Sequence, residues 1–203
     1  MTPTLIMTRP AAQSKSFAAK VAAEWDGSLR IIHSPLIKIV PLSAKVGKPD
    51  AVIFTSVNGV IAAEAFDLPK GLTAWCVGAK TADMAQAAGF VPVIGPGNAD
   101  GLVANIISAK PTGALAHIRG SHARGDVVTR LSDAGITCHD VVAYDQMAMA
   151  LTDEAQVALA ASEPVIFPLF SPRTATILGE QGPFTAPIEV IALSTAVKDA
   201  VSE

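Results

Sequence analysis

Polar and cationic residues recur along the chain where a short apolar run ends and a helix-like stretch begins. Ser56 and Ser171 each place a hydroxyl at such a junction, and Arg9 and Arg119 each place a guanidinium. A serine at such a position is a preferred N-cap of the helix that follows. Helix N-termini offer unpaired N–H groups and a partial positive charge, so several of them on one sheet edge would bind a ligand with many carboxylates or phosphates.

The candidate anion-binding set joins the polar residues of these junctions with the nearby cations. Taken singly, each serine or threonine is well explained as a helix cap, and each surface cation as solvated. Their recurrence at matching places favours a binding role for the set. Its members are Arg9, Thr55, Ser56, Asn58, Gly78, Lys80, Thr81, Arg119, Gly120, Arg124, Ser171, Arg173, Ser194 and Thr195.

The recurrence reflects an internal repeat, in which one series of βα units occurs twice. The aligned pairs are Arg9 with Arg119, Ser56 with Ser171, and Gly78 with Ser194. The second copy begins near Ala114 and stops one strand and one helix before the end of the pattern in the first copy. We therefore expect two similar domains, one of which lacks the last βα unit.

A parallel sheet would bring these junctions to one edge, and the rest of the chain predicts such sheets. Short β-branched apolar runs alternate with Ala-rich amphipathic stretches, as in βα units. Hydrophobic residues make up 50% of the chain and aromatic residues only 5%, so we expect an aliphatic core of buried strands and covering helices. The expected strands are residues 5–8, 29–33, 51–55, 73–77, 91–94, 114–118, 137–144, 164–167 and 188–193. The expected helices are residues 11–24, 57–66, 80–88, 99–108, 122–134, 153–161, 172–180 and 195–202.

Charge and motifs exclude several classes of ligand. The formal net charge is −3, whereas a general nucleic-acid binder carries a net basic surface. No apolar run approaches the roughly 20 residues that cross a bilayer, and the N-terminus lacks the pattern of a signal peptide. The glycine motifs of phosphate loops and dinucleotide sites are also missing from the sequence. We expect a cytoplasmic monomer that binds neither nucleic acid nor a membrane.

Metal ligands and nucleophiles are scarce. Cys76 and Cys138 are isolated thiols in apolar stretches, with no CxxC pair and no histidine at ligand spacing, so we expect small buried hydrophobes and no metal site. His33, His117 and His139 fall within predicted strands, which favours structural roles. The candidate serines lack the G-x-S-x-G setting of an exposed nucleophile.

Tyr144 is the one tyrosine of the chain and the best candidate for acid catalysis. It ends a predicted strand, where an apolar run meets polar residues. There its phenol is placed to donate a proton or a hydrogen bond. A tyrosine at a strand end with its hydroxyl in water explains the pattern equally well, so both interpretations stay open at this point.

The order of these motifs resembles the uroporphyrinogen-III synthase family over residues 5–198. The motifs are MTRP, PLIKIVP, FTSVNGV, CVGAKTA followed by AGF, IRG with a downstream arginine, VVAYDQ and LFSPRTA. The resemblance implies an enzyme of tetrapyrrole (haem) biosynthesis. Such an enzyme closes linear hydroxymethylbilane into uroporphyrinogen III, with loss of water and inversion of the last pyrrole ring through a spiro intermediate, and uses no metal or organic cofactor.

The resemblance also implies the fold: two interleaved flavodoxin-like or Rossmann-like parallel-sheet α/β domains, joined by a two-stranded connection, with the active site in the cleft between them. Residues 1–36 and 148–203 would form the domain that lacks a βα unit, and residues 37–147 the other. The connecting strands would be PLIKIVP and VVAYDQM, which places Tyr144 at the cleft.

The family pattern further assigns roles to matching residues. Tyr144 would be the general acid that assists departure of the hydroxyl group. The residues matching polar cleft positions, which would hold substrate carboxylates, are Thr55, Ser56, Thr81 and Ser171. Much of the catalysis would then come from orienting the flexible tetrapyrrole.

Two departures from the family pattern keep a second interpretation open. The counterpart of Thr81 in the second copy is Val197, where many relatives carry a threonine, although Ser194 or Thr195 offers a nearby hydroxyl. The shortened second copy is the other departure. A synthase-like module that binds a tetrapyrrole or another polyanion without turnover is therefore the alternative, and a flavodoxin-like carrier or phosphoreceiver is more distant.

Overall fold

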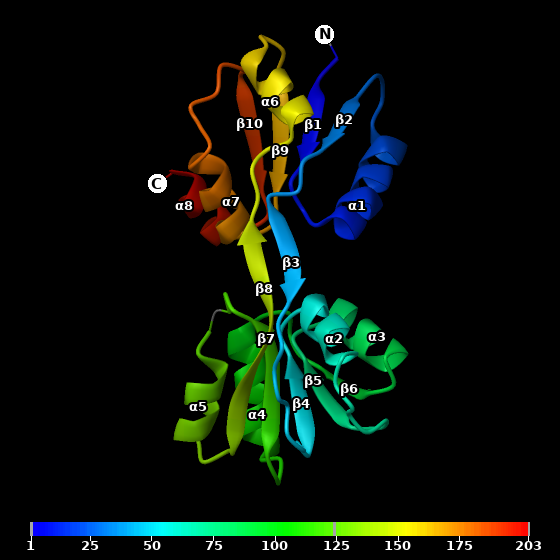
Figure 1. Ribbon diagram of the computed structural model, residues 1–203, viewed down its shortest axis with the longest axis vertical. Helices are drawn as coiled ribbons and strands as arrows, with labels where there is room; N and C mark the ends of the chain where they lie inside the picture. Colours follow the sequence, from blue (N-terminus) through cyan, green and yellow to red (C-terminus); the bar gives the residue numbers. More distant parts are fainter. Residues whose placement is uncertain (1, 124, 203) are drawn as a thin grey trace. The chain divides into compact units, whose positions relative to one another are not determined.

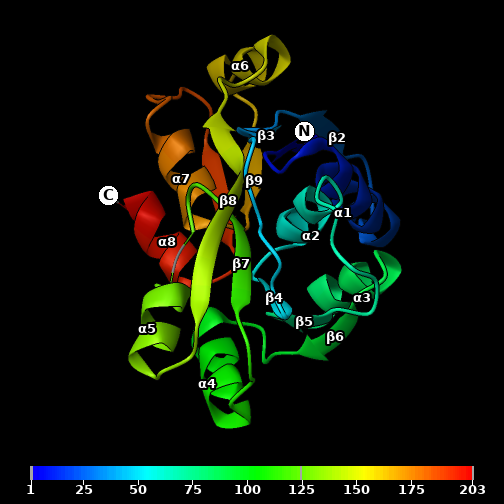
Figure 2. The same ribbon diagram turned by 60° about the horizontal axis from the view of Figure 1, so that its bottom comes forward.

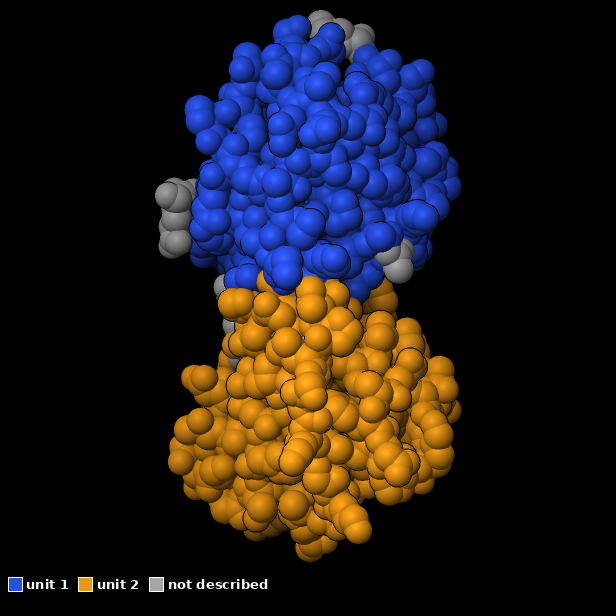
Figure 3. Space-filling view, in the orientation of Figure 1, with its two compact units in different colours: residues 1–38, 147–203 blue, residues 39–146 orange. Residues whose placement is uncertain are grey.

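A computed structural model describes residues 2–123 and 125–202. Its residue contacts divide the chain into two compact units: unit 1 holds residues 1–38 and 147–203, and unit 2 holds residues 39–146 (Figure 3). The sequence predicts that the chain passes from one domain to the other after residues 36 and 147. In the structure the boundaries between the units fall after residues 38 and 146. Unit 1 is thus built from both ends of the chain and unit 2 from its middle.

The larger sheet has six strands in the order β3-β8-β7-β4-β5-β6 (Figure 1). The pairs from β8 to β6 are all parallel. β3 runs antiparallel to β8, since Leu42 N–H donates to Ala143 O while Met149 N–H donates to Leu36 O. The strands are β3 (Ile37–Pro41), β4 (Ala51–Phe54), β5 (Thr73–Cys76), β6 (Val91–Ile94), β7 (Leu115–Gly120) and β8 (Cys138–Ala148).

Helices cover both faces of the unit 2 sheet (Figure 2). Along β4 the side chains alternate, with Val52 and Phe54 packing against α2 and α3, and Ala51 and Ile53 packing against α4 and α5. All four residues of β4 are buried, as expected for a central parallel strand. The helices are α2 (Val57–Ala63), α3 (Ala79–Ala87), α4 (Ala99–Ala109) and α5 (Val127–Asp133).

Unit 1 has a four-stranded parallel sheet in the order β10-β9-β1-β2. Leu5 and Met7 of β1 pack with Ala18 of α1 on one face, while α7 contacts β9 and α8 contacts β10. The strands are β1 (Thr4–Met7), β2 (Arg30–His33), β9 (Val165–Leu169) and β10 (Ile188–Ala192). The helices are α1 (Ala11–Glu24), α6 (Asp153–Ala160), α7 (Pro172–Gly179) and α8 (Thr195–Ser202).

The internal repeat makes the two sheets directly comparable. If Arg9 aligns with Arg119 and Ser171 with Ser56, then β1 corresponds to β7 and β9 to β4. The order β10-β9-β1-β2 then matches β5-β4-β7-β8 strand for strand. Within the described residues, unit 1 has no counterpart of β6 and α4.

Three expectations about local structure were wrong. The helix expected at residues 122–134 begins at Val127, because Gly125 has φ 97° and Asp126 has φ 43°, and a right-handed helix does not pass through such conformations. β3 was missing from the strands expected from composition, and only the family resemblance pointed to it. β8 continues four residues past Tyr144, so this tyrosine lies inside a strand rather than at its end.

Candidate functional site

The chain order of the unit 2 sheet reverses between β4 and β7. From β4 the chain proceeds outward to β5 and β6, and then returns on the other side through β7 and β8. In open parallel sheets, ligands bind at the carboxyl ends of the strands beside such a reversal. Thr55 and Ser56 follow β4, and Arg119 and Gly120 end β7, so four predicted residues stand at this point.

Ser56 begins α2, as the sequence predicts. Its backbone is extended, with φ −158°, and its Oγ accepts a hydrogen bond from the Asn58 N–H at 3.1 Å. Gly59 lets this first turn lie against β7, because a Cβ there would stand 2.6 Å from the Ile118 carbonyl oxygen. The helix therefore starts directly beside the end of β7.

A chain of hydrogen bonds runs across three neighbouring strands at this edge. Thr55 Oγ1 lies 3.1 Å from His117 Nε2, and His117 Nδ1 lies 3.1 Å from Asp140 Oδ1. Arg119 donates two hydrogen bonds to the same carboxylate, from Nε to Oδ1 at 2.7 Å and from Nη2 to Oδ2 at 2.9 Å. Arg119, predicted to bind a ligand anion, thus has a carboxylate partner inside the protein.

Burial and charge set the protonation of this chain. His117 is 2% exposed, and burial lowers its pKa to about 4, with Asp140 opposing the shift and Arg119 adding to it. Burial disfavours the Asp140 anion, but the hydrogen bonds and charge of Arg119, helped by His117, outweigh it and lower the pKa of Asp140. At neutral pH this series of hydrogen bonds therefore contains a neutral imidazole beside a carboxylate–guanidinium pair.

Tyr144 is buried, with 3% exposure, so the interpretation of a strand-end tyrosine with its hydroxyl in water was wrong. Burial raises the pKa of the phenol, while hydrogen bonding with the Ser56 and Gln146 side chains and with the Gly120 backbone, together with the charge of Arg119, partly offsets the rise. The phenol is therefore protonated at neutral pH and surrounded by groups that stabilise its anion.

Two backbone features place this ring. A β-bulge lies between the pairs Arg119–Val142 and Gly120–Tyr144, so one extra residue of β8 is accommodated there. As a result, Ala143 and Tyr144, which are adjacent in the chain, both join the core cluster that α2 and α3 cover. Gly120 makes room for the ring, because a Cβ at this position would lie 2.6 Å from Tyr144 Cε2.

Unit 1 has a corresponding edge at the ends of β1 and β9. The Arg9 guanidinium lies 4.1 Å from the centre of the Phe170 ring and donates to Gln13 Oε1 at 3.1 Å. Burial lowers the pKa of Arg9. Ser171 caps α7 through a hydrogen bond from Thr174 N–H at 3.2 Å, and Pro172 takes the first helical position, as the sequence predicts.

Most of the remaining predicted residues stand at two further helix starts, those of α3 and α8. Gly78 precedes α3 without a side-chain cap, Lys80 is exposed, and Thr81 is 5% exposed and faces inward. Val197, the counterpart of Thr81, is also buried, at 1%.

The Ser194 hydroxyl caps α8 by accepting a hydrogen bond from Val197 N–H at 3.4 Å. Thr195 is exposed and Arg173 half-buried, while Arg124 lies outside the described residues.

Sequence reasoning missed three residues of these edges: His117 as a site residue, Asp140 and Phe170. A signal was present for His117, which stands two residues before Arg119 on one strand, so that both side chains point to the same face. The acid that joins them lies on the next strand, and only the register of β7 with β8 shows the pairing.

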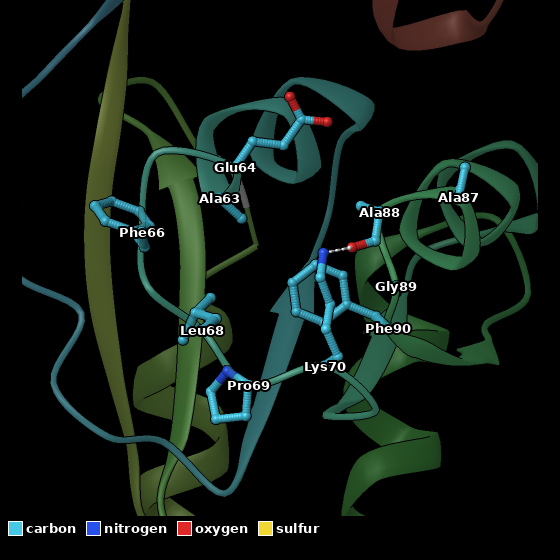
Figure 4. Close-up of a pocket in the computed structure, with 10 residues that line it drawn as sticks. All are labelled: Ala63, Glu64, Phe66, Leu68, Pro69, Lys70, Ala87, Ala88, Gly89 and Phe90. Carbon is cyan, nitrogen blue, oxygen red and sulfur yellow. Dashed lines mark hydrogen bonds between the residues drawn. The ribbon is translucent and has the colours of Figure 1, made fainter.

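A cavity of about 280 Å³ in unit 2 lies away from this edge (Figure 4). The loops after α2 and α3 line it, and Lys70 donates to the Ala88 carbonyl oxygen there at 2.8 Å. These loops lead into β5 and β6, so the cavity is at the amino ends of the strands. It contains none of the candidate residues.

Residues 2–123 and 125–202 form neither a metal centre nor a membrane span. This part of the chain has no group of three or more His, Cys, Asp or Glu side chains arranged to hold a metal ion. Every helix in it is too short or too polar to span a bilayer.

Comparisons with known proteins give a consistent result. A family model described as uroporphyrinogen-III synthase HemD matches residues 19–203. The structure is similar to the crystal structure of uroporphyrinogen-III synthetase from Helicobacter pylori, with a TM-score of 0.70, 16% sequence identity, and coverage of 100% of this chain and 88% of that one. A mutant uroporphyrinogen III synthase from Thermus thermophilus aligns with a TM-score of 0.60, 14% identity and the same coverages. A search of curated proteins found no match. The predicted α/β fold is confirmed.

Proposed function

The chain belongs to the uroporphyrinogen-III synthase family, whose reaction closes hydroxymethylbilane to uroporphyrinogen III, and we propose which of its residues carry that reaction. The chemistry begins with loss of the substrate's hydroxyl group. The pyrrole nitrogen pushes electrons toward the carbon that bears it, the C–O bond breaks, and the leaving oxygen needs a proton.

Tyr144 donates that proton. The observation that carries this role is a buried phenol whose pKa is raised by burial, so that it is fully protonated at neutral pH. A general acid must hold its proton until the leaving group develops charge. Once the proton has moved, the phenolate receives hydrogen bonds from the Ser56 and Gln146 side chains and the Gly120 backbone, and the charge of Arg119 stabilises it.

The substrate's carboxylates are bound by helix N-termini and by Arg9. The starts of α2, α3, α7 and α8 follow Ser56, Gly78, Ser171 and Ser194, and each start presents backbone N–H groups. Arg9 adds a guanidinium that forms no ion pair within the described chain. Both units thus contribute anion-binding groups, in keeping with a polycarboxylate substrate.

We further propose that the enzyme acts as a monomer in the cytoplasm. Cys76 and Cys138 are both free thiols, as is usual in a reducing compartment. Light scattering on the purified protein tests the first point, with 20.8 kDa expected.

Turnover tests the function. Hydroxymethylbilane is generated enzymatically and supplied to the purified protein, and the ratio of uroporphyrinogen III to uroporphyrinogen I is measured. We expect the III isomer to dominate. If only the spontaneous I isomer forms, or if the substrate binds tightly without cyclisation, the proposed function is wrong.

Tyr144→Phe tests the acid. We expect kcat to fall by about a hundredfold or more, because general acid catalysis contributes roughly 10² to 10⁴, while KM changes little. Trp75→Phe is the control, since it alters a buried aromatic of the same unit whose Nε1 has no partner and which is not in the site. Full activity in Tyr144→Phe would show that Tyr144 is not the general acid, and would not contradict the assigned fold or reaction.

A further inference from the structure

A chain of hydrogen bonds joins Thr55, His117, Asp140 and Arg119, and of these residues only Arg119, through its charge, was given a part in the proton transfer assigned to Tyr144. This hydrogen-bond chain joins the end of β4 to β7 and β8, and Thr55 stands next to Ser56, which interacts with the phenol. The direction in which each bond donates determines what Thr55 offers to a ligand.

Asp140 fixes the tautomer of His117. Arg119 donates to both carboxylate oxygens, so Asp140 is ionised and acts only as an acceptor. The Nδ1 of His117 must then carry the hydrogen that joins it to Asp140. Arg119 already balances the charge of this carboxylate, and the imidazole is 2% exposed, so a second proton on the ring would be a buried charge that Asp140 no longer balances.

The neutral ring leaves a lone pair on Nε2, which lies 3.1 Å from Thr55 Oγ1. A neutral imidazole donates through one nitrogen and accepts through the other, and a threonine hydroxyl has one hydrogen. Thr55 therefore donates its hydrogen to His117 and presents only oxygen lone pairs to any other partner. An acceptor of this kind does not bind a carboxylate but does bind an N–H group.

We propose that His117 is a positioning residue that holds Thr55 as the hydrogen-bond acceptor for a pyrrole N–H of the substrate. This inference rests on the proposed function and refines the expectation that Thr55 holds a carboxylate. When the hydroxyl group leaves, positive charge develops on the pyrrole nitrogen and its N–H becomes a stronger donor. The bond to Thr55 is then stronger in the transition state than in the ground state, which raises kcat.

A double-mutant cycle tests the coupling. Thr55→Val removes the hydroxyl and keeps the side-chain shape, and we expect kcat to fall about tenfold, the size of one net hydrogen bond. His117→Leu frees the Thr55 hydrogen to point elsewhere and should cost about the same. In the Thr55→Val background, His117→Leu should then cost little more. Full additivity of the two losses would contradict the positioning role.

The split between kcat and KM separates an N–H ligand from a carboxylate ligand. The loss in Thr55→Val should fall on kcat, because the bond to the N–H strengthens in the transition state, whereas the loss in Arg9→Met should fall on KM, because a carboxylate is bound equally in the ground state and the transition state. If Thr55→Val instead raises KM and leaves kcat unchanged, Thr55 binds a carboxylate and the proposal is wrong. His139→Gln is the matched control, since His139 lies on β8 and its ring contacts the Val46 carbonyl outside the site; its kinetics should match the wild type.

Two further measurements keep the proposal testable if His117→Leu fails to fold. His117→Gln retains an oxygen acceptor toward Thr55 and should recover most of the kcat that His117→Leu would lose. Nitrogen-15 NMR of the wild-type protein should show His117 neutral with its hydrogen on Nδ1. A hydrogen on Nε2 overturns the inference whether or not the protein makes uroporphyrinogen III, so the failure of this inference and that of the proposed function are distinguishable.

Discussion

Arg119 and Arg9 occupy matching places in the two units but face opposite electrostatic situations. Arg119 ends β7 and makes a bidentate pair with Asp140, whereas Arg9 follows β1, stacks on Phe170 and donates to a neutral glutamine. The difference originates in the neighbouring strands. Asp140 pairs in register with His117, and the matching pair in unit 1 is Met7 with His33, which supplies no carboxylate.

The comparison shows how a duplicated fold divides its tasks. In unit 2 the Asp140 carboxylate balances the charge of Arg119 and forms a hydrogen bond with His117, while the charge of Arg119 lowers the pKa of Tyr144. In unit 1 the corresponding charge is left without an acid, and burial opposes it. A substrate carboxylate would relieve that cost, so Arg9 is better placed than Arg119 to bind the ligand.

The largest expected difference between the units is in their response to acid. The pKa of His117 is lowered to about 4 from an ordinary value of 6.5, so the unfolded chain binds this proton more readily. The stability linked to His117 is therefore fully present above about pH 6.5 and is lost as the pH falls to about 4, by about 3 kcal/mol in all. The matching residue of unit 1 is Met7, which does not titrate, so it adds no pH dependence to the stability of unit 1.

Urea unfolding of unit 2 between pH 7 and pH 4.5 measures this loss. Trp75 lies in the unit 2 core and Trp25 at the end of α1, so fluorescence of a Trp25→Phe background reports unit 2. His117→Gln should flatten the dependence in this pH window. An equally steep loss in that variant would show that another group carries the pH response. The lowered pKa of Asp140 predicts a further loss of stability, in wild type and variant alike, as the pH falls below the ordinary carboxyl range.

Replacing each arginine separately with methionine gives the next largest expected difference between the units. Arg9→Met should raise KM about tenfold to a hundredfold, the range of a charge-assisted hydrogen bond, with the free energy of unfolding almost unchanged. Arg119→Met should instead lower the free energy of unfolding by about 2 kcal/mol, because it leaves the Asp140 carboxylate without its main partner. Steady-state kinetics and urea unfolding of both variants check the pair. A large stability loss in Arg9→Met with an unchanged KM would reverse the assignment.

Local features of the sequence predict much of this architecture. The bounds of α1, β6 and α8 match the expected ranges, and the caps Ser56 and Ser171 follow from residue type and position alone. These signals are local, since a cap or an amphipathic turn depends on residues within a few positions.

The features that sequence reasoning missed depend on contacts distant in the chain. Asp140 and Arg119 meet only because β7 and β8 pair in one particular register. The burial of Tyr144 depends on the bulge in β8 and on the missing side chain of Gly120. The left-handed Asp126 that delays α5 is a conformation that non-glycine residues seldom adopt. None of these follows from residue spacing.

The smallest expected difference concerns the two serine caps, and it separates capping from catalysis. Ser56→Ala and Ser171→Ala each remove an N-cap hydrogen bond, so each should lower the free energy of unfolding by about 1 kcal/mol. Only Ser56 also interacts with the Tyr144 phenol and thereby lowers its pKa. Ser56→Ala should therefore raise the phenol pKa further, seen by ultraviolet titration of this single tyrosine, and lower kcat severalfold, whereas Ser171→Ala should leave that pKa unchanged. If both variants change the phenol pKa alike, the Ser56 hydroxyl serves α2 alone, and the phenolate is stabilised by the remaining groups.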